Sequence, residues 1–280
     1  MGNFNLDTDE QKEWYSISTN RSSEHLGDCL ELMPLIADES IDMILCDLPY
    51  GTTACKWDSV IDLPKLWEQY TRIIKPNGII VLTASQPFTS VLTCSNLKWF
   101  KYEWIWEKNL SSNFAAAKYV PMKEHETVLV FYNKTGTYNP IRIEKSEAGK
   151  QRAKYIDKPF VLNEDNVYGK FGFMDKQKEH FREPFTRYPR TVIKFNCERG
   201  LHPTQKPIAL FEYLIKTYTN EGELVLDNTA GSGTTAIACL NTNRQFIVME
   251  KEQKYYDIIL KRVADFNKNF EPKTLFENEM

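Results

Sequence analysis

The alternation of short apolar segments with longer amphipathic segments constrains this fold more than any other feature of the sequence. Six apolar stretches are expected to be strands: Ile41–Cys46, Gly78–Thr83, Tyr102–Trp106, Thr127–Tyr132, Glu223–Leu226 and Gln245–Glu250. Four longer segments are expected to be helices: Leu63–Ile74, Pro207–Thr219, Thr234–Asn241 and Lys254–Phe266. Strands that alternate with helices favour an α/β fold, with a mainly parallel sheet and helices on both faces.

Residues 134–200 interrupt this alternation. The segment has weak hydrophobic periodicity, and it is too long for an ordinary loop. It carries 15 Lys or Arg and 9 Asp or Glu, a net charge of +6, whereas the rest of the chain carries −9. We therefore expect an inserted recognition region that contacts phosphates, although a solvated insert without a ligand would have the same composition.

The composition of the chain excludes several classes of protein. Hydrophobic residues make up 42% and charged residues 26% of the 280 residues, which rules out wholesale disorder. The longest apolar runs, such as Ile79–Leu82 and Val128–Tyr132, fall far short of the roughly 20 residues of a membrane helix. The N-terminal segment lacks the apolar core of a signal peptide, and the six cysteines form no CxxC pair. We expect reduced thiols, a cytoplasmic location, no membrane contact and no metal.

A glycine turn follows the fifth expected strand. Asp227 comes at the end of the strand, Gly231 and Gly233 form the turn, and a helix begins at Thr234. Glu250 lies 19 residues after Gly231, at the end of the next strand. Glycines let the backbone approach a ligand, and a carboxylate can accept hydrogen bonds from ribose hydroxyls, so the segment favours a nucleoside-containing ligand. The glycine spacing also fits a dinucleotide-binding turn loosely, and an ordinary strand–helix turn is the simpler alternative.

A second turn follows the first expected strand. Asp47, Leu48, Pro49 and Tyr50 come directly after that strand. In α/β sheets, ligands bind at the carboxyl ends of the strands. A carboxylate and a backbone carbonyl at this place could accept two hydrogen bonds from one amino group, and the aromatic ring could stack on a base. A strand-ending turn with a capping Asp and a core Tyr is the alternative.

Together, these segments resemble the DNA amino-methyltransferases that use S-adenosylmethionine, the N6-adenine and N4-cytosine enzymes. The hallmark of that family is Asp, Asn or Ser followed by Pro-Pro and an aromatic residue, and it corresponds to Asp47–Tyr50. The cofactor turn of the family, DPFxGSGTT, corresponds to Asp227–Thr235. Two further signatures are HPTQKP at His202–Pro207 and GDCLE at Gly27–Glu31.

The order of these signatures implies a domain organisation. WEK at Trp106–Lys108 and HETVLVFY at His125–Tyr132 are also similar to the family. The catalytic turn precedes the cofactor turn, which is the permuted order of the family's beta group. The resemblance therefore implies a Rossmann-like methyltransferase sheet, with a catalytic half at 20–133, a target-recognition insert at 134–200 and a cofactor-binding half at 201–268.

The chain departs from the family pattern at two places. Leu48 replaces the first Pro of the hallmark, and its main-chain carbonyl can serve the same purpose; DLPYG looks like a variant seen among phage and prophage enzymes. Asn228 and Thr229 replace the Pro-Phe pair of the cofactor turn, which removes a Phe that often packs near the cofactor.

The resemblance also implies roles for individual residues. Tyr50 would stack on a base flipped out of the duplex, while Asp47 and the carbonyl of Leu48 accept the two amino N–H bonds at the turn made rigid by Pro49. The implied cofactor-binding residues are Asp28, Lys206, Asp227, Gly231, Gly233, Thr234, Thr235 and Glu250. The expected DNA contacts are Lys56, Trp57, Arg182, Arg187 and Arg190.

The sequence favours a site-specific N6-adenine methyltransferase with S-adenosylmethionine as cofactor and double-stranded DNA as partner. Cytosine enzymes more often have Ser at the head of the hallmark, but N4-cytosine methylation uses the same geometry and stays open. An NAD-dependent oxidoreductase would explain the glycine turn and not DLPYG or HPTQKP. A non-catalytic DNA-binding protein is disfavoured by the intact Asp47, Tyr50 and glycines. The recognition sequence, a restriction partner and a homodimer are left open.

Overall fold

The computed structural model describes residues 22–51, 59–153, 185–198, 200–201 and 204–270. The chain divides into two compact units. The first comprises the residues up to 139 and those from 191 onward, and the second comprises residues 140–190. Each unit has its own sheet, and the cavity described below belongs to the first.

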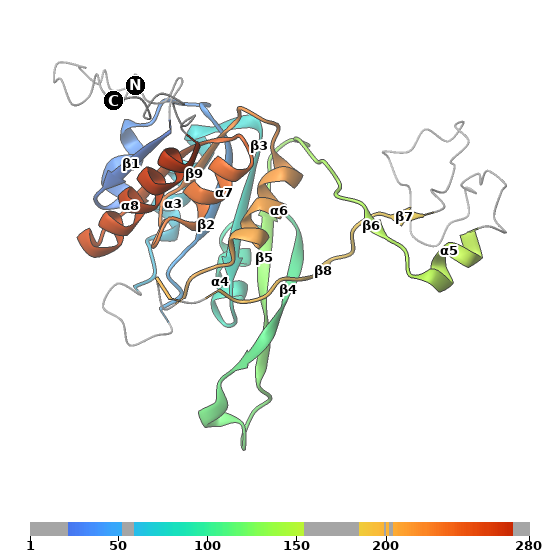
Figure 1. Ribbon diagram of the computed structural model, residues 1–280. Coiled ribbons are helices and arrows are strands. Elements are labelled where there is room, and N and C mark those ends of the chain that lie inside the picture. The colour runs from blue at the N-terminus through green and yellow to red at the C-terminus, as the bar shows by residue number, and fades with distance from the viewer. Residues whose placement is uncertain (1–21, 52–58, 154–184, 199, 202–203, 271–280) are drawn as a thin grey trace, which may run out of the picture. The chain divides into compact units, whose positions relative to one another are not determined.

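An eight-stranded sheet forms the centre of the first unit (Figure 1), in the order β1-β10-β9-β2-β3-β5-β4-β8. The strands are β1 (Ser23–Leu26), β2 (Ile41–Asp47), β3 (Ile74–Ala84), β4 (Phe100–Ser112), β5 (Lys123–Phe131), β8 (Val192–Lys194), β9 (Leu224–Asp227) and β10 (Gln245–Glu250). The strands from β1 to β3 in this order are all parallel, and β5 runs antiparallel between β3 and β4. The sheet is therefore mainly parallel, as the sequence predicts.

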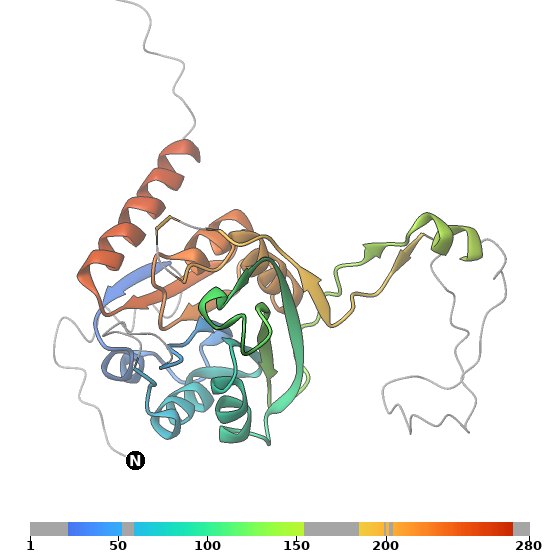
Figure 2. The same ribbon diagram turned by 90° about the horizontal axis from the view of Figure 1, so that it is seen from below.

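Helices cover both faces of this sheet. They are α2 (Cys29–Leu32), α3 (Leu63–Ile73), α4 (Phe88–Ser95), α6 (Ile208–Tyr218), α7 (Thr234–Asn241) and α8 (Gln253–Phe270). Figure 2 shows α3 and α4 on one face of the sheet and α6, α7 and α8 on the other.

Strand β2 explains why both faces need a cover. Successive side chains of a strand point to opposite faces. Ile44 and Cys46 belong to the core on the α3 side, whereas Met43 and Leu45 belong to the core on the α6 side. A strand buried on both faces is apolar throughout, as in a parallel sheet between two helical layers. The Rossmann-like fold expected from the sequence is confirmed.

The sheet changes direction between β9 and β2. These strands are neighbours, with Met43 opposite Val225 and Ile44 opposite Leu226. From β9 the chain continues outward to β10, whereas from β2 it continues outward the other way to β3. Adjacent parallel strands whose connections leave in opposite directions open a crevice at their carboxyl ends. The turns that begin at Asp47 and Asp227 both lie at this crevice.

The second unit contains strands β6 (Ile143–Glu144) and β7 (Thr186–Arg187), which pair antiparallel, and helix α5 (Glu147–Ala153). The Arg142 guanidinium lies over the Tyr188 ring, 4.6 Å from its centre. The predicted insert at 134–200 is wider than this unit, because β8 pairs with β4 in the large sheet. Among the residues for which the structure gives a position, no helix combines the length and apolar character that crossing a bilayer requires.

Candidate active site

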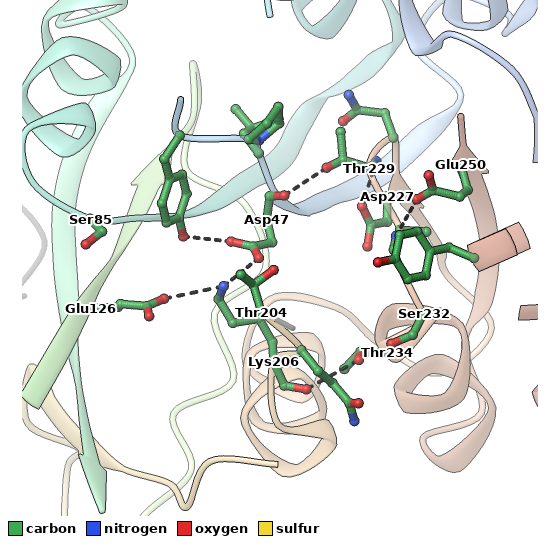
Figure 3. A pocket seen from close by; sticks show the side chains of 18 of the residues that line it. Asp47, Ser85, Glu126, Thr204, Lys206, Asp227, Thr229, Ser232, Thr234 and Glu250 are labelled. Carbon is green, nitrogen blue, oxygen red and sulfur yellow. Dashed lines mark hydrogen bonds and ion pairs between the residues drawn. The ribbon is translucent and has the colours of Figure 1, made fainter. Parts of the chain in front are cut away.

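A cavity of about 750 Å³ opens at the carboxyl ends of β2 and β9 (Figure 3). Its walls include Asp47, Leu48, Pro49 and Tyr50 from the first turn. They also include the glycine turn from Asp227 through Ser232. Two segments separated by about 180 residues in the chain therefore face one space, and a volume in this range suits a small-molecule ligand.

The Asp47 carboxylate is held on both of its oxygens. The Tyr50 hydroxyl donates to Oδ1 at 2.7 Å, and the Thr83 hydroxyl donates to the same oxygen at 2.5 Å. The Lys206 ammonium donates to Oδ2 at 2.5 Å. The Tyr50 ring also stacks on Phe88 of α4, with ring centres 5.5 Å apart. The carboxylate and the aromatic ring of the DLPY turn are thus fixed relative to each other.

Buried charges continue from Lys206 away from Asp47. Lys206 Nζ lies 3.4 Å from Glu126 Oε2, and Lys108 bonds to the other oxygen of Glu126. Burial would lower the pKa of Lys206, but the charges of Asp47 and Glu126 raise it above its ordinary value. Burial likewise works against the charged form of Glu126, yet Lys206 and Lys108 hold its pKa below the ordinary value. Lys108, Glu126, Lys206 and Asp47 therefore form a row of alternating basic and acidic side chains, and the two pKa shifts favour the charged forms of Lys206 and Glu126.

Thr229 joins the two turns directly. Its hydroxyl donates to the main-chain oxygen of Asp47 at 3.1 Å. Its neighbour Asn228 is buried and accepts hydrogen bonds from the Tyr70 hydroxyl at 2.5 Å and the Cys46 thiol at 2.8 Å. The two residues that replace the Pro-Phe pair therefore anchor the glycine turn to β2 and to α3.

Hydrogen bonds within the glycine turn hold its carboxylate. The Asp227 carboxylate accepts hydrogen bonds from the amide of Thr229 at 3.0 Å and from the hydroxyl of Thr235. Burial raises the pKa of Asp227 to about 7. Gly231 and Gly233 have φ angles of 54° and 80°, the left-handed region that disfavours a side chain. A Cβ at Gly233 would also lie 3.0 Å from Ile259, so α8 packs closely against this turn.

Two acidic residues border the glycine turn. Glu250 accepts hydrogen bonds from the amides of Gly231 at 2.7 Å and Glu252 at 2.8 Å, and burial raises its pKa. Asp28 caps helix α2 and pairs with Lys251 at 2.9 Å, and this hydrogen bond lowers the pKa of Asp28. Both residues line the cavity.

The remaining predicted cofactor residues take different positions. Thr234 lines the cavity, and its hydroxyl donates to the main-chain oxygen of Lys206 at 3.3 Å. Gly233 and Thr235 are not among the residues that line the cavity. Lys206 lines the cavity, but its ammonium group bonds to Asp47, on the side of the DLPY turn.

The predicted DNA contacts fall partly outside the described structure. Lys56, Trp57 and Arg182 lie outside the described residues. Arg187 and Arg190 belong to the second unit, where Arg187 ends β7 and Arg190 is exposed.

Sequence reasoning did not single out Glu126, Lys108 or Thr83 as site residues. Lys108 and Glu126 lie within the family-like segments 106–108 and 125–132, and both are charged residues beside apolar strand positions. A charged side chain that is buried needs a partner of opposite charge, so charged residues within these strands indicate a buried ion pair.

Among the residues that the structure describes, the side chains around the cavity have an acidic excess. Four lysines of these residues line it: Lys108, Lys123, Lys206 and Lys251. Seven acidic residues line it: Asp28, Asp47, Glu126, Glu198, Asp227, Glu250 and Glu252. Such a lining favours a ligand with net positive charge. The described residues contain no group of three or more His, Cys, Asp or Glu that could hold a metal ion.

The comparisons with known proteins all indicate one family. The DNA methylase family matches residues 41–261 of this chain. The chain is 31% identical over 251 residues to the DNA adenine methyltransferase YhdJ of Escherichia coli strain K12, which covers 85% of this chain and 81% of that protein. It is 25% identical over 257 residues to the type II methyltransferase M.HpaI of Haemophilus parainfluenzae, which covers 86% of this chain and 74% of that protein.

Solved structures share the fold. The M1.HpyAVI–SAM complex superposes with a TM-score of 0.57 at 23% identity, covering 86% of this chain and 98% of that one. The cytosine-N4-specific PvuII DNA methyltransferase superposes with a TM-score of 0.59 at 15% identity, covering 90% of this chain and 93% of that one. At these identities the likeness concerns the arrangement of sheet and helices.

Proposed function

Because this chain belongs to the DNA methylase family, whose members methylate N6 of adenine or N4 of cytosine, we propose that it transfers a methyl group to N6 of adenine at a specific DNA sequence. One observation carries the proposal. The Asp47–Tyr50 turn and the glycine turn open onto the same cavity, so a base bound by the first meets a cofactor bound by the second. The family membership leaves no place for the oxidoreductase alternative.

S-adenosylmethionine is the cofactor, and when bound it supplies an electrophilic methyl group on a positively charged sulfur. The residues of the cavity fit such a group. The acidic excess of the lining suits a cationic ligand. The Glu250 carboxylate accepts backbone hydrogen bonds from Gly231, Lys251 and Glu252. A carboxylate offers about four acceptor sites, so one remains with which Glu250 would hold a ribose hydroxyl. Asp28, across β10 from the turn, would border the adenine ring.

The DLPY turn would activate the amino group of the target base. The lone pair of an exocyclic amine is delocalised into the ring, so the ground state is planar and a poor nucleophile. The Asp47 carboxylate and the Leu48 carbonyl would accept its two N–H bonds and favour the pyramidal nitrogen of the transition state, where positive charge develops. The Leu48 side chain is buried in the core, which leaves its main chain for this task.

The Tyr50 ring would stack on the flipped base. Extruding a base costs a few kcal/mol, which stacking and the amino hydrogen bonds must offset. Phe88 already packs against Tyr50 and fixes the orientation of its ring. Holding the base and the methyl donor near contact distance would supply roughly 7–11 kcal/mol of the rate enhancement.

Adenine is preferred over cytosine for two reasons. Asp47 heads the hallmark turn, whereas Ser is more common in cytosine enzymes. The relative with 31% identity over most of both chains is named a DNA adenine methyltransferase.

The second unit, residues 140–190, would contribute to target recognition. It lies within the segment 134–200 that carries a net charge of +6, and its Arg190 and Tyr188 are exposed. Positive side chains that neutralise phosphates make DNA affinity fall steeply with salt. Arg190→Ala is therefore expected to reduce the salt dependence of DNA binding.

The test of the proposed function is methylome sequencing of DNA from cells that express the protein, with nucleoside analysis of the same DNA. The expected result is N6-methyladenine at one sequence motif, absent when Asp47→Ala is expressed at the same level. N4-methylcytosine at a motif would replace the adenine assignment, and unmodified DNA would overturn the proposal.

A further inference from the structure

We propose that Lys206 and Glu126 are positioning residues that hold the Asp47 carboxylate in one orientation, so that a single acceptor site on it faces the incoming amino group. The inference rests on the proposed function, since it concerns the group that receives the target base. It gives Lys206 a different role from cofactor binding.

The contacts of Asp47 leave little freedom. A carboxylate offers about four acceptor sites, two on each oxygen. The hydroxyls of Tyr50 and Thr83 occupy both sites on Oδ1, and the Lys206 ammonium occupies one on Oδ2. One site on Oδ2 remains for an N–H bond of a substrate. The amino group of a base has two N–H bonds, so the second N–H needs another acceptor. The main-chain carbonyl of Leu48, the residue that follows Asp47, is the candidate.

Lys206 is itself held in place. Its side chain is only 6% exposed, and it lies between Asp47 and Glu126. Its ammonium group sits 5.6 Å from the centre of the Tyr50 ring, and its main-chain oxygen accepts a hydrogen bond from Thr234 of α7. Figure 3 shows the Lys206 ammonium group between the carboxylates of Asp47 and Glu126. A lysine fixed at backbone, side chain and ammonium group can hold Asp47 in one orientation.

Glu126 anchors Lys206 from the far side. Glu126 and Lys108 are each 13% exposed and pair across the β5 and β4 strands. The alternating row of Lys108, Glu126, Lys206 and Asp47 thus extends from β4 through β5 to the end of β2.

Stability alone does not explain this row. Removing charges from water costs several kcal/mol per ion, and buried ion pairs often stabilise a fold no better than apolar residues of the same size. The row ends on the catalytic carboxylate at the cavity wall, where orientation matters more than stability. Its position therefore indicates a task in catalysis.

The charge of Lys206 has a consequence for the pH profile. The titratable or charged groups that face Asp47 are Tyr50 and Lys206 in direct contact, with Glu126 and Asp227 beyond them. Although burial lowers the pKa of Lys206, the charge of Asp47 raises it. The same attraction favours the carboxylate, so a variant without Lys206, in which the two acidic neighbours remain, favours a protonated carboxyl at position 47. Protonated Asp47 would carry a hydrogen where the amino group needs an acceptor.

The experiment measures single-turnover methyl transfer between pH 5 and 9 in four proteins: wild type, Lys206→Met, Lys206→Arg and Glu126→Gln. Lys206→Met is expected to lower the rate at pH 7 by about 10²–10³-fold and to move the acid limb upward by about one pH unit or more. Lys206→Arg keeps the positive charge, so the acid limb of its pH–rate profile should stay at the wild-type pH. Its rate should be at least about tenfold higher than that of Lys206→Met. Glu126→Gln should lower the rate about tenfold without an upward shift, because it removes a negative charge.

A second measurement does not depend on turnover. The carboxyl carbon of Asp47 can be followed by 13C NMR, assigned from its loss in Asp47→Asn, and should titrate at higher pH in Lys206→Met than in wild type. Lys75→Met is the matched control. Lys75 of β3 pairs at 2.7 Å with Asp42, which lies on β2 as Asp47 does, and neither Lys75 nor Asp42 lines the cavity. Binding of S-adenosylhomocysteine and thermal melts establish that each variant is folded.

The outcomes separate the two proposals. The positioning role would be overturned if Lys206→Met kept the wild-type rate, the wild-type acid limb of the pH–rate profile and the wild-type titration of Asp47. The proposed function would stay intact. A uniform loss in Lys206→Met and Lys206→Arg, with no change in limb or titration, would also overturn it in favour of a purely structural role. Absence of methyl transfer to DNA adenine in the wild type would instead overturn the proposed function.

Discussion

The two turns that meet at the cavity are held by different kinds of contact. In the glycine turn, the Asp227 carboxylate accepts hydrogen bonds from the amide of Thr229 and the hydroxyl of Thr235, two and eight residues away. In the DLPY turn, Asp47 bonds to Thr83 and Lys206, 36 and 159 residues away. The carboxylate of the glycine turn is thus held by residues nearby in the chain, whereas the carboxylate of the DLPY turn depends on side chains that are distant in the chain. We expect changes on the two sides to separate into effects on cofactor affinity and effects on rate.

Asp47→Ala should give the largest effect and sharpen the comparison most. It removes the proposed acceptor for the amino group and leaves Lys206 with Glu126 as its remaining acidic contact. We expect the single-turnover rate to fall by about 10³-fold or more, while affinity for S-adenosylhomocysteine, measured by calorimetry, changes little. A variant that loses cofactor affinity as strongly as rate would show that the two sides are not separable.

Asp227→Asn tests the glycine side through pH. The folded carboxyl has a pKa of about 7, raised from 3.8 by burial. As pH rises from about 4 to 7, the unfolded chain releases this proton before the folded chain does, so burial of Asp227 increasingly disfavours folding. Asn carries no such cost. We therefore expect the variant to gain on the order of 2–4 kcal/mol relative to wild type across this range, levelling off above pH 7.

Thermal melts of both proteins at each pH measure this difference. A stability gap between variant and wild type that stays constant from pH 4 to 8 would mean that Asp227 titrates normally.

Glu250→Gln should affect the cofactor and spare the rate. The two carboxylate oxygens accept from the amides of Gly231 and Glu252, and an amide side chain would turn a donor toward one of them. Hydrogen bonds to a charged group contribute about 1.5–3 kcal/mol, so affinity for S-adenosylhomocysteine should fall about 10–100-fold. The single-turnover rate at saturating cofactor should stay within about threefold of wild type. Glu221→Gln, at an exposed position, is the control.

Thr229→Val should give the smallest effect and is the one change expected to touch both sides. It removes the hydroxyl that bonds to the main-chain oxygen of Asp47 and keeps the shape of the side chain. Losing one such hydrogen bond costs about 1 kcal/mol, so we expect a Tm lower by about 2–4 °C and a rate several-fold lower. Unchanged stability and rate would mean that the two turns keep their relative positions without this bond.

The same contrast explains how much the sequence could predict. Helix α7 and strand β10 have the predicted bounds, because the glycines and the apolar strands around them are local signals. The partners of Asp47 could not be found this way. The pairing of Asp47 with Lys206 depends on the fold bringing together positions 159 residues apart, and no spacing rule connects them.

Helix α4 shows the same limit within the fold. Its sequence, FTSVLTCS, is rich in Ser, Thr and Val, which have low helix propensity, and no side chain caps its start. The helix forms because Phe88 and Leu92 pack into the core beside Tyr50. Tertiary packing here outweighs local preference, and it supplies the ring that supports Tyr50, the residue proposed to stack on the target base.

The most direct measurement is a crystal structure with S-adenosylhomocysteine bound. The account predicts that its ribose contacts Glu250 and that its sulfur lies in the cavity with an unobstructed path to Asp47 and Tyr50. A ligand bound outside this cavity, or one whose sulfur faces away from the DLPY turn, would contradict the account.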